Sequence, residues 1–236
     1  MSQLALPLSL EDRGVFESFW NGGNEALVAF LTALADDSRQ DGSRTGCWIR
    51  GVEATGKTHL LQAVCERLGD DSVYVPLERF FGSGPGVLEG LASRRCICLD
   101  NIDAVAADEP FELALFTLLN EVADREALLV VAARTTPRDC SFVLPDLLSR
   151  LSRLPLFQLQ PLDEAGRIHA LQLRATHRGL QLPEDTARFM LNRSRRDMAS
   201  LYRLLDLLDA EALKAQRRLT IPFVRAILGS GRDSSP

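Results

Sequence analysis

The sequence predicts an α/β protein built on a parallel sheet, followed by a small all-helical unit. Three observations lead to this fold class. Short apolar runs typical of buried strands alternate with segments whose apolar residues recur at helical spacing. A glycine-rich loop lies between one such strand and one such helix. From Asp163 onward the strand-like runs stop, and only helical spacing remains.

The order of the elements follows from these patterns. Apolar runs predict strands at 46–50, 72–77, 95–100, 127–133 and 154–159. Helical spacing predicts helices at 25–34, 59–68, 111–124, 163–178, 183–192, 197–214 and 221–228. Because helices separate the strands, we expect a five-stranded parallel sheet covered on both faces. The expected organisation is a three-layer αβα domain over 10–162, a helical unit over 163–229 and a disordered polar tail over 230–236.

The loop Gly51–Thr58 has the sequence Gly-Val-Glu-Ala-Thr-Gly-Lys-Thr, which matches the phosphate-binding pattern GxxxxGK[ST]. Its glycines let the backbone curl so that N–H groups point at phosphate oxygens. Lys57 places a positive charge on the β- and γ-phosphates, and the Thr58 hydroxyl can hold Mg²⁺. The helix predicted at 59–68 adds the positive end of its dipole. The alternative, a chance glycine-rich turn, does not explain why one of only two lysines in the chain stands where the pattern requires it.

Polar residues follow two of the predicted strands. Asp100 ends the apolar run 95–100, which places its carboxylate at the edge of the sheet where ligands bind. There it can share Mg²⁺ with Thr58, although a strand-end aspartate can also simply cap a turn. Arg134 follows the run 127–133 and, with the threonines after it, is a candidate sensor of the terminal phosphate.

Aromatic residues precede the phosphate-binding loop. Phe16, Phe19 and Trp20 lie close together, with Asn24 shortly after them. Such side chains can wall a purine base, or they can pack into the core of the domain. The sequence leaves both uses open.

Composition restricts the function classes. With 46% hydrophobic residues the chain can build a sizeable core, and no apolar stretch is long enough to predict a membrane span or a secretory signal. The five cysteines favour buried free thiols in a reducing cytoplasm, and Cys96 and Cys98 fit core packing better than a metal pair. A net charge of −5 makes the chain a poor DNA binder by electrostatics. That charge is unevenly divided, because residues 1–144 are acidic and residues 145–236 are basic.

These motifs resemble those of the AAA+ ATPase superfamily, in the clade of the bacterial replication initiator DnaA, and more narrowly those of the Hda family of initiator inactivators. The family motifs fall on 51–58 (Walker A), 96–103 (Walker B), Arg134 (sensor 1), 144–151 (box VII) and Arg196 (sensor 2). The resemblance implies that ADP, or ATP, binds with Mg²⁺. It assigns nucleotide binding to Phe16, Gly51, Thr55, Gly56, Lys57, Thr58, His59, Asp100, Arg134 and Arg196, and Mg²⁺ to Thr58 and Asp100.

The N-terminal segment 1–9 is apolar although it lies at a terminus. From the residues alone it is either a docking peptide or a segment folded back on its own domain. It resembles the family's peptide for the β sliding clamp, in which Gln3 sets the register and an apolar groove takes the side chains that follow. The residues concerned are Gln3, Leu4, Leu6, Pro7 and Leu8. Since no helix-turn-helix domain follows the helical unit, we expect no direct sequence-specific DNA binding.

One departure from the superfamily bears on mechanism. Many AAA+ enzymes carry a glutamate directly after the Walker B aspartate, where it activates the attacking water. Here Asn101 follows Asp100, and an amide cannot accept a proton at neutral pH. Asp103 is a displaced substitute. We therefore expect weak intrinsic hydrolysis and a stably held nucleotide, which by resemblance is ADP.

The resemblance implies a cytoplasmic regulator, associated with the replisome, that docks on the DNA-loaded clamp and inactivates DnaA. Box VII puts Arg150 at the arginine finger, which would act in trans on ATP bound to DnaA and so prevent re-initiation of replication. Arg153 is a rival for that role on the same helical face. The alternatives are an autonomous ATPase such as a helicase loader, and a DNA-binding initiator. AAA+ surfaces also allow a homodimer or a higher homo-oligomer.

Overall fold

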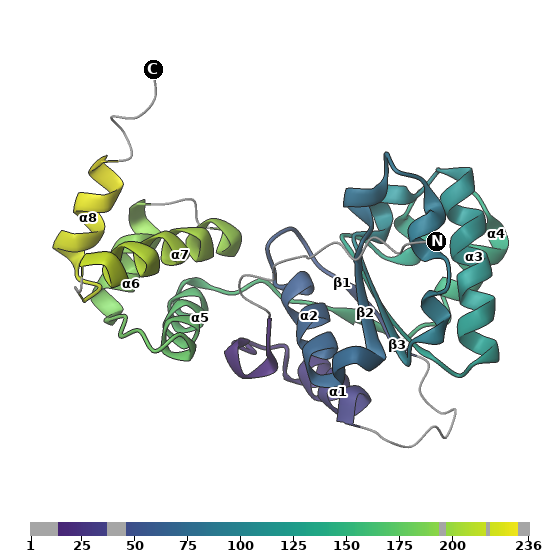
Figure 1. Cartoon of the computed structure of the whole chain (residues 1–236), viewed down its shortest axis with the longest axis horizontal. Coiled ribbons are helices and arrows are strands. Elements are labelled where there is room, and N and C mark those ends of the chain that lie inside the picture. The colour runs from purple at the N-terminus through teal and green to yellow at the C-terminus, as the bar shows by residue number, and fades with distance from the viewer. Residues whose placement is uncertain (1–13, 37–45, 194–196, 216–217, 231–236) are drawn as a thin grey trace.

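The computed structural model describes residues 14–36, 46–193, 197–215 and 218–230. Figure 1 shows two lobes: an α/β domain that contains the sheet, and a helical lid joined to it by the segment that follows the last strand. The described residues include no helix that is both long and apolar enough to cross a membrane. All five cysteines are free thiols.

The sheet is five-stranded and entirely parallel, with the order β2-β3-β4-β1-β5. Its strands are β1 (Gly46–Arg50), β2 (Ser72–Pro76), β3 (Cys96–Asp100), β4 (Leu128–Ala133) and β5 (Leu156–Gln158). The register aligns Arg50 with Ala133 and Gln158, and Pro76 with Asp100. The carboxyl ends of the strands therefore meet at one edge of the sheet, from which the phosphate-binding loop continues.

Helices cover both faces of this sheet (Figure 1). The helices of the α/β domain are α1 (Glu25–Asp36), α2 (Lys57–Leu68), α3 (Glu109–Asp124) and α4 (Pro145–Leu151). Alternate residues of β3 point to opposite faces, as the pleat requires. Cys96 and Cys98 pack with residues of α1 and α2, whereas Ile97 and Leu99 pack with residues of α3 and α4. The predicted three-layer fold is confirmed.

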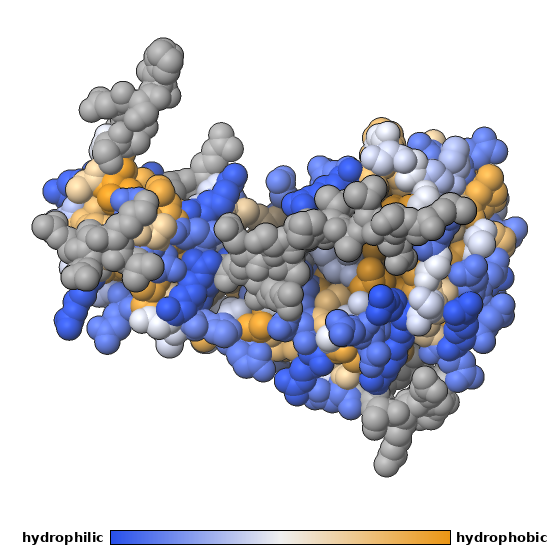
Figure 2. All heavy atoms as spheres, viewed as in Figure 1, coloured by the Kyte–Doolittle hydropathy of each residue, from blue (hydrophilic) through white to orange (hydrophobic). Residues whose placement is uncertain are grey.

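The lid consists of helices, namely α5 (Glu164–His177), α6 (Glu184–Arg193), α7 (Met198–Ala215) and α8 (Ile221–Ser230). They surround an apolar core of their own, which includes Leu171, Met190 and Leu205. The carboxylate of Asp163 caps α5 by accepting a hydrogen bond from the Gly166 N–H at 2.7 Å. The all-helical character predicted for this part of the chain is confirmed. Figure 2 shows mostly hydrophilic residues over both lobes, with hydrophobic residues reaching the surface in places.

Candidate functional site

The phosphate-binding loop runs from the end of β1 to the first turn of α2. The Gly51 N–H donates to the Ala133 carbonyl at 3.1 Å, which fixes the start of the loop to the neighbouring strand. Gly56, at the N-cap of α2, has a φ of +104°. A Cβ at this position would lie 2.8 Å from the ring of Phe19. Both the backbone conformation and the close aromatic ring therefore require glycine here.

Lys57 is buried beneath this loop. Its Nζ donates to the carbonyl oxygens of Gly51 at 2.6 Å and Val52 at 2.9 Å. Burial lowers the pKa of Lys57, while the carboxylates of Asp100 and Asp103 oppose that shift. A phosphate beside the ammonium would favour the charged form in the same way as these carboxylates. The loop thus holds a cation at the point where the sequence predicts the β- and γ-phosphates.

Asp100 lies behind the loop, and only 1% of it is exposed. Its Oδ2 accepts hydrogen bonds from the Thr58 hydroxyl at 2.6 Å and from the Tyr74 hydroxyl at 2.9 Å, and its Oδ1 accepts the Asn101 N–H at 3.0 Å. Burial raises the pKa of the Tyr74 phenol, so this hydroxyl remains a donor. The two side chains predicted to hold Mg²⁺, those of Thr58 and Asp100, are therefore in direct contact.

These two oxygen ligands fit Mg²⁺ chemically, because this ion takes one or two protein oxygens and completes its shell with phosphate and water. Among the described residues there is no cluster of three or more His, Cys, Asp or Glu side chains that could hold a metal ion by itself. The donor set thus suits an ion that binds together with a nucleotide.

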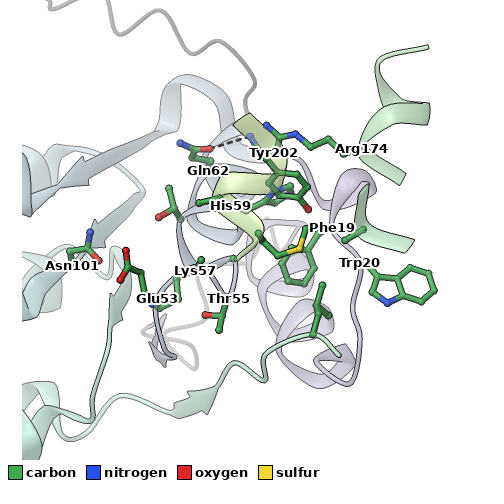
Figure 3. A pocket seen from close by; sticks show the side chains of 18 of the residues that line it. Phe19, Trp20, Glu53, Thr55, Lys57, His59, Gln62, Asn101, Arg174 and Tyr202 are labelled. Atoms are coloured by element: carbon green, nitrogen blue, oxygen red, sulfur yellow. Dashed lines mark hydrogen bonds between the residues drawn. The ribbon is translucent and has the colours of Figure 1, made fainter. Parts of the chain in front are cut away.

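A cavity of about 690 Å³ opens beside the loop (Figure 3). The α/β domain and the lid both line it. Its residues from the α/β domain include Gly14, Phe19, Trp20, Glu53, Thr55, Gly56, Lys57, Thr58, His59, Gln62, Glu78, Asn101 and Arg134. Its residues from the lid are Ala170, Arg174, Met198, Ala199 and Tyr202. A cavity of this size, at the carboxyl edge of the sheet, can hold a nucleotide.

The segment before α1 forms one wall of the cavity. It is fixed to α2 by the Gly14 N–H, which donates to Gln62 Oε1 at 3.2 Å (Figure 3). His59 Nε2 also lies 2.8 Å from the Val15 carbonyl. Since a carbonyl only accepts, the His59 Nε2 carries the proton. Phe19 lies against the His59 ring with centroids 5.4 Å apart.

The lid forms the opposite wall. The Arg174 guanidinium lies 4.1 Å from the centroid of the Tyr202 ring, and both side chains line the cavity. Burial lowers the pKa of Arg174 and raises that of Tyr202 to about 12. At the entrance to the lid, Trp20 stacks on His169 with centroids 4.8 Å apart. Aromatic contacts thus connect the two lobes beside the cavity.

Charged and amide side chains line the end of the cavity beyond β3. Asn101 Nδ2 donates to Glu78 Oε2 at 3.1 Å, and Arg134 Nε donates to Asp103 Oδ2 at 2.7 Å. Asn101, Glu78 and Arg134 line the cavity, whereas Asp103 does not. Asp103, considered above as a displaced base, therefore accepts a hydrogen bond from Arg134, and Glu78 is the carboxylate that stands next to Asn101.

Two of the remaining predicted residues, Phe16 and Arg150, lie outside the cavity lining. Phe16 does not line it; its ring packs against the core between α1, α2 and the sheet, while Phe19 and Trp20 occupy the wall predicted for it. Arg150 lies in the last turn of α4, away from this cavity, with its guanidinium 5.1 Å from the centroid of the Phe116 ring. Arg196 and the peptide residues Gln3, Leu4, Leu6, Pro7 and Leu8 lie outside the described residues.

Several residues that line the cavity are absent from the sequence prediction, among them the polar and aromatic residues Gln62, Glu78, Arg174 and Tyr202. Gln62 could have been found, because it lies one turn after Thr58 on α2 and so shares a face with it. Glu78, Arg174 and Tyr202 carry no local signal, since each reaches the cavity only through the packing of distant elements.

Comparison with known proteins identifies the second part of the chain first. Residues 163–228 match the family model described as "Hda, lid domain". Residues 163–228 form an Hda-type lid.

Solved structures extend this result to the fold of the whole chain. Domain III of the replication initiation protein DnaA from Thermotoga maritima aligns with a TM-score of 0.74 and 20% identity, covering 92% of this chain and 95% of that one. AMPPCP-bound DnaA from Aquifex aeolicus aligns with a TM-score of 0.67 and 20% identity, covering 86% and 67%. The RuvB Holliday junction branch migration motor from Thermotoga maritima aligns with a TM-score of 0.60 and 16% identity, covering 88% and 69%. The chain therefore has the fold of DnaA domain III, and its residues 163–228 match the lid domain of Hda.

Proposed function

We propose that this protein is an ADP-binding regulator that inactivates the replication initiator DnaA at the β sliding clamp. The observation that carries the proposal is the Hda-type lid, joined to an α/β domain with the DnaA fold. In this proposal the protein docks on the DNA-loaded clamp and stimulates hydrolysis of DnaA-bound ATP, which prevents re-initiation of replication. It works in the cytoplasm with the replisome, as a monomer or a homo-oligomer.

The nucleotide is ADP or ATP with Mg²⁺. Lys57 and the N-terminus of α2 bind the phosphates, and Thr58 and Asp100 hold the ion. Phe19, Trp20 and Tyr202 enclose the base end of the cavity. The AMPPCP-bound form of a DnaA with the same fold supports an adenine nucleotide. Since Asn101 supplies no carboxylate beside Asp100, the bound nucleotide serves as a structural ligand.

Arg150 is the arginine finger that acts on the partner's nucleotide. It does not line the cavity of its own chain, so a role at a phosphate requires a second molecule. Its side chain is partly buried and rests on Phe116, which limits the directions in which it can point. Arg153 is exposed just beyond the end of α4 and is the rival candidate.

The decisive experiment measures hydrolysis of DnaA-bound ATP in the presence of DNA-loaded clamp. We expect Arg150→Ala to lower the stimulated rate on the order of a thousand-fold, the range that an arginine finger in trans supplies. Arg153→Ala is the matched control and should retain most of the rate. A full loss with Arg153→Ala and none with Arg150→Ala would transfer the role to Arg153, and no loss with either would reject the proposal.

The clamp contact is tested separately, because its peptide lies outside the described residues. Gln3→Ala and Leu4→Ala should abolish clamp pull-down while ADP affinity stays unchanged, with Ser9→Ala as the control. Retained clamp binding in both variants would reject the docking peptide.

One observation favours a second function, that of an autonomous ATPase. The Glu78 carboxylate lines the cavity and accepts a hydrogen bond from Asn101, so it stands near the position where a water-activating acid is expected. Turnover by the isolated protein of about one per second or faster, abolished by Glu78→Gln, would support this function against the regulatory one.

A further inference from the structure

Helix α3 carries a glutamate that is completely buried. Glu112 has 0% exposure. Its Oε1 accepts the N–H groups of Ala107 at 2.9 Å and Val143 at 3.0 Å, and its Oε2 accepts those of Val143 at 3.0 Å and Leu144 at 2.7 Å. Within the described residues no Lys or Arg forms an ion pair with it. Backbone donors therefore compensate the cost of burying this carboxylate.

These donors belong to two separate loops. Ala107 lies in the loop that leads from β3 into α3, and Val143 and Leu144 immediately precede α4, of which Leu144 is the N-cap. One carboxylate thus fixes the start of α4 both to α3 and to the loop that follows Asp100 and Asn101 on the nucleotide side of the sheet.

The same face of α3 also contacts the other end of α4. Phe116 follows Glu112 by four residues, so the two side chains lie one above the other on the helix. The Phe116 ring lies 5.1 Å from the guanidinium of Arg150. Helices α3 and α4 pack side by side (Figure 1). Glu112 holds the beginning of α4, and Phe116 supports the arginine in its last turn.

We infer that Glu112 and Phe116 are positioning residues that set the reach and direction of Arg150 toward the phosphate of a partner molecule. The inference rests on the proposed function of Arg150. Glu112 determines where α4 begins, and therefore how far along its axis Arg150 lies. Phe116 sets the orientation of the Arg150 guanidinium through a cation–π contact. This contact uses the face of the guanidinium and leaves its N–H groups available to a phosphate.

The test uses clamp-stimulated hydrolysis of DnaA-bound ATP, measured as a function of the concentration of this protein. Glu112→Gln keeps the shape of the side chain but turns an NH₂ group toward backbone N–H donors. We expect the maximal rate to fall roughly tenfold to a hundredfold, as for a catalytic group misplaced by about 1 Å. The half-saturating concentration should change less than about twofold. Glu109→Gln makes the same charge change at an exposed position of α3 and is the control.

A second pair of variants isolates Phe116. Phe116→Leu keeps an apolar side chain but removes the ring, and should lower the maximal rate about two- to fivefold. Phe116→Tyr keeps the ring and should restore it. If Glu112→Gln fails to fold, this pair still decides the question, because neither substitution leaves a buried polar group unpaired.

A double-mutant cycle separates positioning from a merely structural role. In an Arg150→Ala background, Phe116→Leu and Glu112→Gln should have no further effect on the maximal rate, because the group they position is gone. Equal losses with and without Arg150 would overturn the inference. So would full maximal rates in both single variants while Arg150→Ala abolishes stimulation. If Arg150→Ala itself has no effect, the proposed function fails instead.

Discussion

The two lobes of the molecule contribute different chemistry to one cavity. The α/β domain supplies charged and polar groups from a continuous stretch of chain, such as Lys57 and Thr58, held by hydrogen bonds of 2.6 to 2.9 Å. The lid supplies mostly apolar and aromatic surface, such as Met198 and Tyr202. Under the proposed function, one local loop binds the phosphates, while the base end of the cavity is formed between two separately packed cores.

The largest effect is expected at the phosphate end. Lys57→Ala removes the buried cation and should weaken ADP affinity roughly 10- to 150-fold, the range for a lost hydrogen bond to a charged group. Isothermal titration measures it, with Arg67→Ala as the control, since Arg67 is an exposed arginine of α2 that pairs with Asp36. A loss of less than about threefold would mean that the loop does not dominate binding.

A substitution at an expected Mg²⁺ ligand also tests how much the α/β domain contributes to nucleotide affinity. Thr58→Val removes one of the two protein oxygens and should lower Mg²⁺-dependent affinity about tenfold. Chelation of Mg²⁺ should then weaken ADP binding in the parent protein and have little further effect in the variant. The control is Thr117→Val, whose hydroxyl only donates to the Leu113 carbonyl on α3. An unchanged response to chelation in Thr58→Val would remove Thr58 from the metal site.

The lid should matter less. Tyr202→Ala removes a ring from the cavity wall and leaves Arg174 without its aromatic partner, and we expect ADP affinity to fall about two- to fivefold. Tyr202→Phe keeps the ring and should bind nearly as well as the parent. If Tyr202→Ala lowers ADP affinity as much as Lys57→Ala does, the α/β domain does not dominate nucleotide binding and the comparison is wrong.

The strand, loop and helix around Lys57 are the part of the candidate site that the sequence predicts most directly. Strand, loop and helix are contiguous around Lys57, so local pattern is enough to place it, and Asp100 follows from an apolar run that ends in an acid. Phe16 shows the limit: three aromatics lie close together in sequence, and only packing decides that Phe19 and Trp20 line the cavity. Helix α4 has only seven residues, too few for periodicity to reveal it.

Glu112 shows the same limit more strongly. In the sequence it is one acidic residue on an amphipathic helix, which predicts a solvated position. Its burial depends on two loops that fold over it and present backbone donors, and nothing in the local sequence encodes that arrangement. A local sequence pattern therefore cannot identify a residue such as Glu112, whose hydrogen-bond partners are backbone groups of distant segments.

The smallest effect concerns the pH dependence of stability at the junction of the lobes. Burial lowers the pKa of His59, while the hydrogen bond to the Val15 carbonyl opposes this shift. The unfolded chain therefore binds more protons than the folded one below the ordinary value of 6.5, so the protein loses stability as pH falls through that value. His59→Gln should flatten the fall of Tm between about pH 7.5 and 5.5, the range on either side of the ordinary His pKa of ~6.5. His169→Gln, at an exposed position, should leave it unchanged, and equal slopes in all three proteins would contradict this account.

The placement of the two tryptophans has a practical consequence. Trp48 is fully buried in β1 and donates to the Thr135 carbonyl at 2.9 Å, so its fluorescence reports only on the integrity of the sheet. Trp20 is 38% exposed and stacked on His169 of the lid, so its surroundings change when the two lobes separate. Replacing Trp48 by phenylalanine leaves Trp20 as the single tryptophan, with which a separation of the two lobes can be timed in a stopped-flow instrument without an attached dye.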